Sequence, residues 1–388
     1  MSITSPLLPL HTKSSLLTAR TATALPHLAS ASRTQQLRTP LTHIPRSQVS
    51  LHRKMITTTV PKTMRAILVP KTGGPEVLTY TDTQPTPTPL DNEVLVKNEY
   101  AGVNFIDTYF RTGLYKAPTG LPMIIGQEGV GKVVAVGGGD VEGLKVGDEV
   151  VWLKSGAYAE YTAVPATRAL KFPPGIPPQT ALGAFIMGLT SLALVNESHH
   201  IKKGDKVLLH AAAGGVGLLM CQLLKSFGAI TIGTASTDEK CALAKANGAD
   251  FMINYTKDKE WVKEVMRLTS GEGVDVVYDS VGRTTWEGSL EAVKRKGEVI
   301  FFGNASGPVP PIDLPLLAAK NTKIMRAALF QYITTREEFA FYSNWLFDLL
   351  KEGKLNVKIH GVYPLEEAQR VHRELEGRGT TGKLLLKL

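Results

Sequence analysis

The chain has 388 residues, of which 43% are hydrophobic, and a mean hydropathy near zero. These values are typical of a soluble globular protein of about two domains. No apolar run approaches the roughly 20 residues needed to cross a bilayer, so the sequence predicts no membrane-spanning segment. The two cysteines, Cys221 and Cys241, exclude a disulfide framework and a four-cysteine zinc site. Both lie in predicted helices, where we expect buried structural thiols.

The net charge of +9 comes from the N-terminal segment. Residues 1–63 hold eight of the 44 basic residues and no acidic residue, which leaves 36 basic against 35 acidic residues in the rest of the chain. A body so close to neutral argues against a nucleic-acid-binding face, because such faces need clustered Lys and Arg.

Residues 1–63 are also rich in Ser, Thr and Pro. A segment that is rich in Arg and Ser and poor in acids is typical of an organelle transit peptide, and it buries too little apolar surface to fold alone. We therefore expect a mitochondrial protein whose folded part begins at Met64. The alternatives are a tail that carries no address, or a cytoplasmic form translated from Met55 or Met64.

The first folded part, residues 64–185, contains short alternating strands separated by Gly and Pro. Clear examples are residues 93–97, 131–136 and 147–151. This pattern predicts a β-rich, barrel-like domain. Proline pairs at 173–174 and 177–178 mark its end.

After residue 200, apolar strands alternate with amphipathic helices. We predict strands over Lys206–His210, Ala229–Gly233, Asp250–Tyr255, Val274–Asp279, Glu298–Gly303 and about Lys323–Leu329. The predicted helices cover 215–227, 238–247, 257–269 and 284–294. This alternation indicates a parallel sheet with helices on both faces, which binds its ligand at the carboxyl ends of the strands. The tail, 336–388, is expected to be helical with a closing strand over Lys383–Leu388.

A glycine-rich turn directly follows the first of these strands and opens a helix. It contains Gly214, Gly215, Val216 and Gly217. Such a turn lets the backbone approach a pyrophosphate, and the helix N-terminus supplies free N–H groups and a positive dipole end. The run differs from G-x-G-x-x-G, but its place between strand and helix favours a dinucleotide site over a simple tight turn.

The end of the second strand indicates which dinucleotide binds. A site that prefers NAD usually has an Asp or Glu there to hold the ribose 2′-hydroxyl. This strand has no acid at that place and is followed by Ser236, Thr237 and Lys240. Hydroxyl and ammonium groups suit a 2′-phosphate, so we predict NADPH. Asp238 and Glu239 argue against it unless the helix directs them elsewhere.

Seven motifs follow one another along the body of the chain. They are Gly73–Leu78, Gly102–Tyr109, His210–Gly217, Asn254–Tyr255, Tyr278–Gly282, Gly303–Gly307 and Tyr332–Arg336. In this order they resemble the zeta-crystallin-like NADPH:quinone oxidoreductases, which are zinc-free members of the medium-chain dehydrogenase/reductase superfamily. The resemblance covers about residues 64–388.

The resemblance implies an α/β protein of two domains. A GroES-like, β-rich catalytic domain would span 64–187 and be completed by 325–388, and a Rossmann-type domain with a doubly wound parallel sheet would span 188–324. It also implies NADPH in the cleft between them and a homodimer formed through the cofactor domains.

Cofactor contacts are implied at the positions that match the family's motifs. The expected set is Phe105, Asp107, Tyr109, Thr190, Gly214, Gly215, Val216, Ser236, Thr237, Lys240, Tyr255, Val281, Gly303, Asn304, Ala327, Leu329 and Arg378. The chain departs from many relatives at Met187, where they have a polar residue, and at Phe330–Gln331. Either departure would alter the fit of substrate or cofactor.

The resemblance extends to the frame of the zinc alcohol dehydrogenases but not to their ligands. Asn104 stands at the cysteine position and Gln127 at the histidine position, and neither residue type is a good zinc ligand. We therefore expect no metal and interpret Glu128 as a buried, hydrogen-bonded carboxylate. The adjacent pair His199–His200 does not converge on one ion, and His210 is expected to be a satisfied core histidine.

Without a Lewis acid, the substrate must accept hydride readily, as quinones do. We expect Asn104 and Tyr109 to hydrogen-bond the developing oxyanion, and the Tyr109 phenol to be a candidate proton donor as well as an aromatic wall. Trp286 and Asp279 are interpreted as structural. The basic run 294–296 is interpreted as a solvated helix end.

Two alternative functions stay open at this stage. A reductase of α,β-unsaturated carbonyls needs the same hydride delivery to an activated acceptor. Relatives of zeta-crystallin are also associated with AU-rich RNA, so a binding role with minor catalysis is the second alternative, which the nearly neutral body disfavours.

Overall fold

The computed structural model describes residues 60–388. The expected targeting segment and the start at Met55 therefore lie outside the described residues. The first strand, β1, covers Thr63–Val69, which places Met64 one residue inside regular structure.

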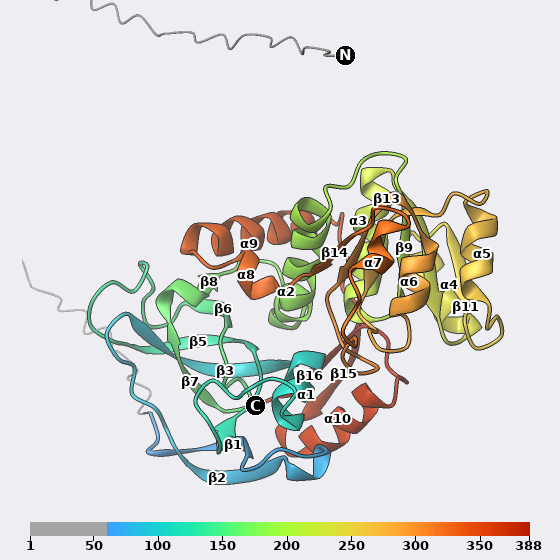
Figure 1. Cartoon of the computed structure of the whole chain (residues 1–388). Coiled ribbons are helices and arrows are strands. Elements are labelled where there is room, and N and C mark those ends of the chain that lie inside the picture. The colour runs from blue at the N-terminus through green and yellow to red at the C-terminus, as the bar shows by residue number, and fades with distance from the viewer. Residues whose placement is uncertain (1–59) are drawn as a thin grey trace, which may run out of the picture. The chain divides into compact units, whose positions relative to one another are not determined.

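The half of the molecule that contains the N-terminal strands also includes the last two strands of the chain, and it forms two β-sheets (Figure 1). A three-stranded sheet has the order β2-β1-β4, and a seven-stranded sheet has the order β15-β16-β3-β5-β6-β8, with β7 paired to β3. The strands are β2 Thr79–Pro85, β3 Glu93–Val103, β4 Met123–Ile124, β5 Glu128–Val136, β6 Glu149–Leu153, β7 Tyr161–Pro165, β8 Ala169–Lys171, β15 Ile359–Pro364 and β16 Lys383–Lys387.

The C-terminal half contains the predicted parallel sheet. Its order is β11-β10-β9-β12-β13-β14 and every neighbouring pair is parallel. The strands are β9 Lys206–Leu209, β10 Ile230–Ala235, β11 Phe251–Asn254, β12 Val274–Asp279, β13 Val293–Phe301 and β14 Lys323–Arg326. Strand order turns back at β9 and β12, and such a switch point is where sheets of this type bind ligands.

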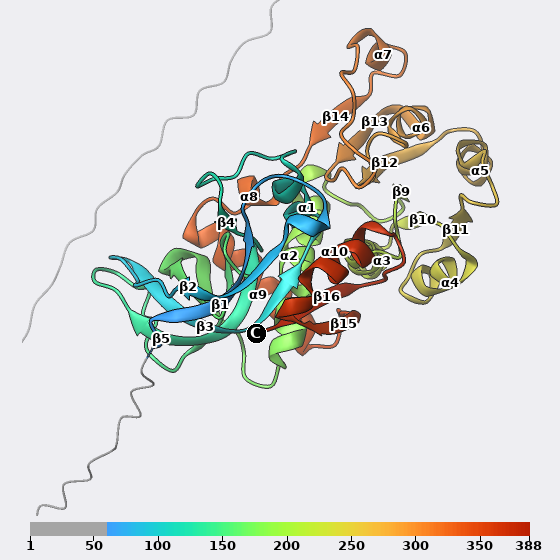
Figure 2. The same ribbon diagram turned by 90° about the horizontal axis from the view of Figure 1, so that it is seen from below.

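Helices cover both faces of this sheet (Figure 2). Because side chains alternate along a strand, Val207 and Leu209 pack with α2 and α3 on one face, whereas Leu208 packs with α5 and α6 on the other. The helices of the chain are α1 Phe105–Thr112, α2 Pro178–Ala193, α3 Gly215–Phe227, α4 Asp238–Ala246, α5 Trp261–Leu268, α6 Trp286–Ala292, α7 Pro315–Ala318, α8 Leu329–Tyr332, α9 Arg336–Lys351 and α10 Ala368–Glu376.

Helix α2 connects the two halves. Pro178 starts it, and it continues without a break past Met187, so the expected domain boundary at 187/188 falls inside a helix. Pro178–Ser198, which includes one π-helical turn over Leu194–Ser198, is long and apolar enough to meet the criterion for a membrane span. This apolar run was overlooked in the sequence, but its length and composition alone do not make it a membrane span. In the most apolar window of this helix, 72% is buried inside the protein, where α2 packs against α3 and α9.

Three local predictions were also wrong. Lys294, Arg295 and Lys296 belong to strand β13, not to a helix end, since α6 stops at Ala292 and Lys294 pairs with Asp275. The helix predicted from residue 257 starts only at Trp261. Cys221 is buried as expected, but Cys241 is only half-buried.

Candidate active site

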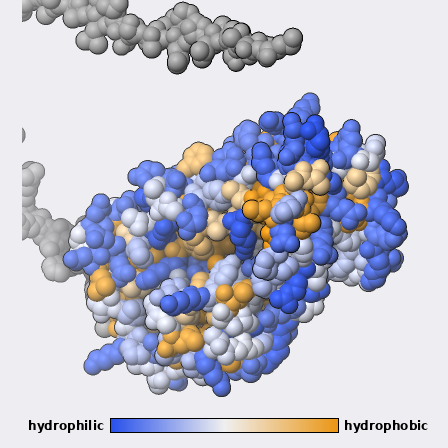
Figure 3. Space-filling model, in the orientation of Figure 1, coloured by the Kyte–Doolittle hydropathy of each residue, from blue (hydrophilic) through white to orange (hydrophobic). Residues whose placement is uncertain are grey.

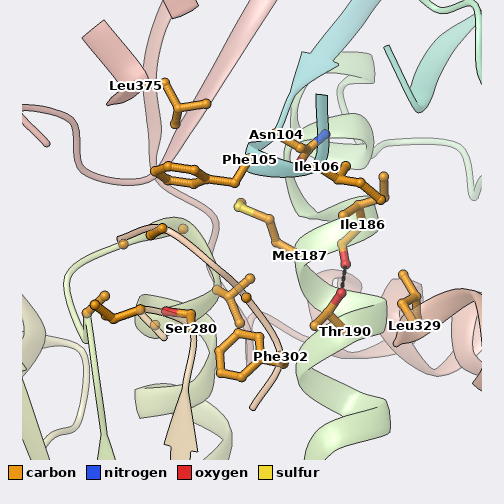
Figure 4. Close-up of a pocket in the computed structure, with 18 of the residues that line it drawn as sticks. Asn104, Phe105, Ile106, Ile186, Met187, Thr190, Ser280, Phe302, Leu329 and Leu375 are labelled. Carbon is orange, nitrogen blue, oxygen red and sulfur yellow. Dashed lines mark hydrogen bonds between the residues drawn. The ribbon is translucent and has the colours of Figure 1, made fainter. Parts of the chain in front are cut away.

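A cavity of about 630 Å³ lies at the carboxyl ends of the parallel strands, a size typical of cofactor sites. Every strand of the sheet is followed by a residue that lines it: Ala211, Ser236, Tyr255, Ser280, Phe302 and Ala327. The opposite wall comes from α1, α2 and β16. Figure 3 shows apolar surface in the hollow between the two halves, and Figure 4 shows the side chains that converge there.

The glycine turn before α3 forms one part of the cavity wall. Gly214 is the N-cap of α3 and has no side chain to cap the helix, so the first N–H groups face outward. A Cβ on Gly215 would lie 2.1 Å from the Met187 sulfur, and one on Gly217 would lie 2.4 Å from the Ala211 carbonyl oxygen. At Gly217 the close atoms are backbone, so only glycine fits there, whereas Gly215 packs against the flexible Met187 side chain. The helix N-terminus that follows this turn is suited to an anion.

Hydroxyl and basic groups gather at the far end of the cavity, beyond β10. Ser236, Lys240, Tyr255 and Arg378 line it. The Lys240 ammonium donates to the backbone carbonyl of Arg378, and burial lowers the pKa of Lys240. Thr237 does not line the cavity, because its hydroxyl caps α4 by accepting from the Lys240 backbone N–H at 3.3 Å.

The two neighbouring acids, Asp238 and Glu239, do not place negative charge in this end of the cavity. Asp238 accepts a hydrogen bond from Asn254 at 2.7 Å and forms an ion pair with Lys257. Neither Asp238 nor Glu239 lines the cavity. The far end is therefore basic, as a 2′-phosphate requires.

Helix α1 supplies the opposite end of the cavity, which we call the near end. Phe105 and Tyr109 line the cavity, and the Tyr109 hydroxyl accepts the backbone N–H of Asn304 at 2.7 Å, which joins the two halves. Burial raises the pKa of Tyr109 to about 12, so the phenol keeps its proton at neutral pH. Asn304 itself lies outside the cavity lining and acts through this backbone contact.

Asp107 was expected among the cofactor contacts, but it is fully buried and does not line the cavity. It is the third residue of α1, and its Oδ2 accepts from the backbone N–H of Asn104 at 2.8 Å and from the Tyr158 hydroxyl at 3.0 Å. Burial raises its pKa to about 7. This side chain holds the start of α1.

A buried cation lies beside Asn104. The Lys383 ammonium forms an ion pair with Glu128 and donates to the Asn104 amide oxygen at 2.6 Å, with both charged side chains at most 1% exposed. Glu128 also accepts from the Asn104 amide nitrogen and from the Ile186 backbone N–H, each at 2.9 Å. Glu128 is thus the buried carboxylate that the sequence predicts, whereas Lys383 was missed.

These contacts change the role available to Asn104. Its amide group bridges Lys383 and Glu128, and its other contact is the Gly102 carbonyl at 3.4 Å. The donor that was expected to meet an oxyanion is therefore engaged inside the protein. Asn104 still lines the cavity, and its amide orientation is set by Lys383.

The remaining expected residues lie where a cofactor would reach them. The cavity lining includes Thr190, Gly214, Gly215, Val216, Val281, Gly303, Ala327 and Leu329. Other lining residues were not singled out from the sequence, among them Ile106, Tyr115, Ile186, Phe302, Arg326 and Gly382. Most of these are apolar or small, and no sequence motif distinguishes them from core residues.

The structural histidines and acids behave as expected. His210 is buried between the hydroxyls of Thr234 and Ser289 at 3.0 and 3.2 Å, and Asp279 accepts from the backbone N–H groups of Val281 and Gly282. His199 lies between Asp205 and Glu298, away from the cavity.

Known proteins resemble this chain in both sequence and architecture. The model of the alcohol dehydrogenase GroES-like domain matches residues 90–174, and that of the zinc-binding dehydrogenase matches residues 215–347. A probable quinone oxidoreductase of Schizosaccharomyces pombe is 45% identical over 321 residues, which cover 82% of this chain and 96% of that protein. The chain belongs to the quinone oxidoreductase family.

Solved structures of the family share the fold. The crystal structure of Escherichia coli quinone oxidoreductase complexed with NADPH superposes with a TM-score of 0.80 at 42% identity, and the match covers 84% of this chain and all of that one. A 2-haloacrylate reductase of a Burkholderia species is 35% identical over 329 residues, which cover 83% of this chain and 98% of that protein. The quinone oxidoreductase frame is therefore similar to enzymes with more than one kind of acceptor.

The family description mentions zinc, but the described residues of this chain do not offer a set of zinc ligands. Within residues 60–388 no three His, Cys, Asp or Glu side chains are grouped so as to hold a metal ion. The two positions at which we expected zinc ligands in the related dehydrogenases hold the amides Asn104 and Gln127, and the neighbouring Glu128 is paired with Lys383.

Proposed function

We propose that the protein reduces quinones with NADPH by hydride transfer and without a metal ion. The observation that carries this proposal is a single cavity with a helix N-terminus and basic groups at one end and a largely apolar chamber at the other. NADPH, when bound, supplies the hydride.

The residues present fit this cofactor. The Gly214–Gly217 turn and the N-terminus of α3 would hold the pyrophosphate, since no side chain caps the first N–H groups of this helix. Ser236, Lys240 and Arg378 would hold the 2′-phosphate by charge-assisted hydrogen bonds. Complexes of similar enzymes with NADPH support the same choice.

The chain's own residues would orient the acceptor and keep water out. Phe105, Ile106, Ile186 and Phe302 give the chamber apolar walls that suit a flat, neutral ring (Figure 4). The Tyr109 phenol keeps its proton and has no hydrogen-bond acceptor among residues 60–388, so it can donate to an oxygen that gains negative charge. Quinones accept hydride without a Lewis acid, which agrees with the amides Asn104 and Gln127 at the positions where metal ligands would be expected.

The test is NADPH oxidation by the purified full-length chain. Acceptors are 1,4-benzoquinone, 9,10-phenanthrenequinone and an alkenal, each with NADPH or NADH and with or without a chelator. We expect chelator-insensitive quinone reduction that prefers NADPH. Loss of activity with the chelator, or NADPH binding without turnover, would contradict the proposal.

A reductase of α,β-unsaturated carbonyls is the second candidate. The similarity to a 2-haloacrylate reductase favours it, and the Tyr109 proton would serve an enolate as well as a quinone oxyanion. In the same assay, turnover of the alkenal alone would select this function.

We also propose a homodimer formed along strand β14. This strand is at the edge of the six-stranded sheet and all four of its residues are exposed, including Ile324 at 36% and Met325 at 40%. An apolar edge of this kind is usually covered, and pairing with a second copy covers it. Light scattering of the wild type and of Met325→Lys tests this: a wild-type monomer would contradict it.

Mitochondrial targeting by residues 1–63 remains our proposal from composition. N-terminal sequencing of the cellular protein tests it. A product that retains residue 1 inside the cytoplasm would contradict it.

A further inference from the structure

Gln127 has an amide group without a partner in the wall of the cavity. The residue is 5% exposed, lines the cavity, and its Nε2 makes no hydrogen bond within residues 60–388. Burying an amide donor without a partner is unfavourable, so folded proteins rarely leave one in this state unless a ligand or water satisfies it.

The backbone around Gln127 is held firmly. Gly126 has φ +97°, and a Cβ there would lie 2.4 Å from the Tyr158 ring, so the chain reaches Gln127 through a turn that only glycine permits. On the other side, Glu128 is fixed by Lys383, Asn104 and Ile186. The position of Gln127 in the chain is therefore set.

The other side-chain donors of this end of the cavity are engaged or are tyrosine hydroxyls. The Thr190 hydroxyl donates to the Ile186 carbonyl at 2.7 Å, and the Asn104 amide donates to Glu128 at 2.9 Å. The Lys383 ammonium is committed to Glu128 and Asn104. Gln331 also lines the cavity but is exposed, so within residues 60–388 the Gln127 amide is the one buried nitrogen donor of the lining that makes no hydrogen bond.

We propose that Gln127 Nε2 binds the carbonyl oxygen of the acceptor. This inference rests on the proposed function and adds the residue that selects a carbonyl-bearing substrate. A neutral amide suits a neutral quinone oxygen before the reaction, and its hydrogen bond strengthens as that oxygen gains negative charge.

The experiment compares Gln127→Met with Gln179→Met in the full-length protein. Methionine keeps the length of the side chain but has no donor. Gln179 is a matched control, because its amide donates to the Tyr100 hydroxyl at 2.9 Å and lies outside the cavity lining. Kinetics with 1,4-benzoquinone, NADPH binding by fluorescence and urea unfolding are measured for each variant.

Gln127→Met should lower kcat/KM for 1,4-benzoquinone about tenfold, the effect of one neutral hydrogen bond, and leave the NADPH Kd within about twofold. Its urea midpoint should stay the same or rise, because an unsatisfied donor is removed. Gln179→Met should lower the urea midpoint and keep kcat/KM. Gln127→His, which retains a donor, should recover part of the loss.

Three outcomes would overturn the assignment, and they are distinguishable. Wild-type kcat/KM in Gln127→Met would show that the amide does not bind the acceptor. A parallel rise of the NADPH Kd would assign the amide to the cofactor's own carboxamide. If the wild type binds NADPH but reduces no quinone, the proposed function fails first, and the acceptor site falls with it.

Discussion

The two ends of the cavity handle charge in different ways. At the far end, Lys240 is half-buried and Arg378 is exposed, and neither forms an ion pair with an acid of the described chain. At the near end, Lys383 and Glu128 are almost completely buried and neutralise each other. Charges near water are available to a ligand, whereas buried and paired charges hold the protein together. Substitutions at the far end should therefore change binding, and those at the near end should change stability first.

The largest effect is expected from Lys383→Met. The substitution leaves Glu128 buried without a counter-charge, which should lower the free energy of unfolding by about 3–5 kcal/mol. Urea unfolding measures this. The double variant Lys383→Met with Glu128→Gln removes both charges and should regain most of the loss, whereas Lys263→Met, in an exposed ion pair with Glu260, should change little. An equal loss of unfolding free energy in the single and double variants would show that the unpaired charge of Glu128 is not the cause of the loss.

Asp107 gives the near end a pH dependence. Burial raises its pKa from 3.8 to about 7, so the folded protein holds this proton more tightly than the unfolded chain does. Its contribution to stability is complete below about pH 4 and is lost as the pH rises through 7. The Asn side chain of Asp107→Asn does not titrate, so the variant does not lose this contribution as the pH rises. The difference in free energy of unfolding, variant minus wild type, should therefore increase by on the order of 1–3 kcal/mol between pH 4 and pH 8.

Urea unfolding at several pH values tests this sign. Parallel stability curves for the wild type and Asp107→Asn would show that Asp107 is ionised throughout and that burial does not dominate its pKa.

The sequence predicts the parts of the site that depend on local patterns. The glycine turn, the acid-free end of β10 and the alternation of strands and helices all follow from neighbouring residues, whereas the buried Glu128 was expected from the resemblance to the zinc dehydrogenase frame. Lys383 was missed because its partner Glu128 is 255 residues away in the chain. A lysine at the start of an apolar strand looks like a solvated end until the pairing of β16 with β3 places it beside Glu128.

Other differences have a similar origin. Strand β15 was not predicted, since Ile359–Pro364 contains Gly and Pro and pairs only with β16 at the edge of the sheet. Lys294–Lys296 resembles a helix end by charge, but it lies in an irregularity of strand β13, between the pairs that Val293 and Glu298 make with β12, and Lys294 forms an ion pair with Asp275. Long-range pairing decides such segments, and local composition does not report it.

At the far end, Lys240→Ala should weaken NADPH binding and leave stability nearly unchanged. The loss of one charge-assisted hydrogen bond to the 2′-phosphate should raise the NADPH Kd by roughly tenfold or more, with little effect on NADH. Fluorescence titration measures both, and the difference should shrink at high salt. Lys263→Ala, on the surface of α5, is the control. An equal loss for NADH would move Lys240 from the 2′-phosphate to another part of the cofactor.

The smallest of these changes concerns one phenol oxygen. Tyr109→Phe should lower kcat for 1,4-benzoquinone about tenfold and change the NADPH Kd less, because the hydroxyl acts mainly when negative charge develops on the acceptor. Since burial holds the pKa of Tyr109 at about 12, its proton is present throughout the neutral range, and wild-type kcat should show no alkaline decline from this group below about pH 11. Tyr363→Phe is the control, because the Tyr363 hydroxyl donates to Glu374 outside the cavity, and it should retain wild-type kcat.

A double variant of Tyr109 and Gln127 tests whether the two groups hold the same oxygen. If they do, the double variant should lose less transition-state stabilisation than the sum of the two single losses, because the second donor has no oriented partner once the first is gone. Strictly additive losses would place the two groups on different atoms and separate proton delivery from acceptor binding.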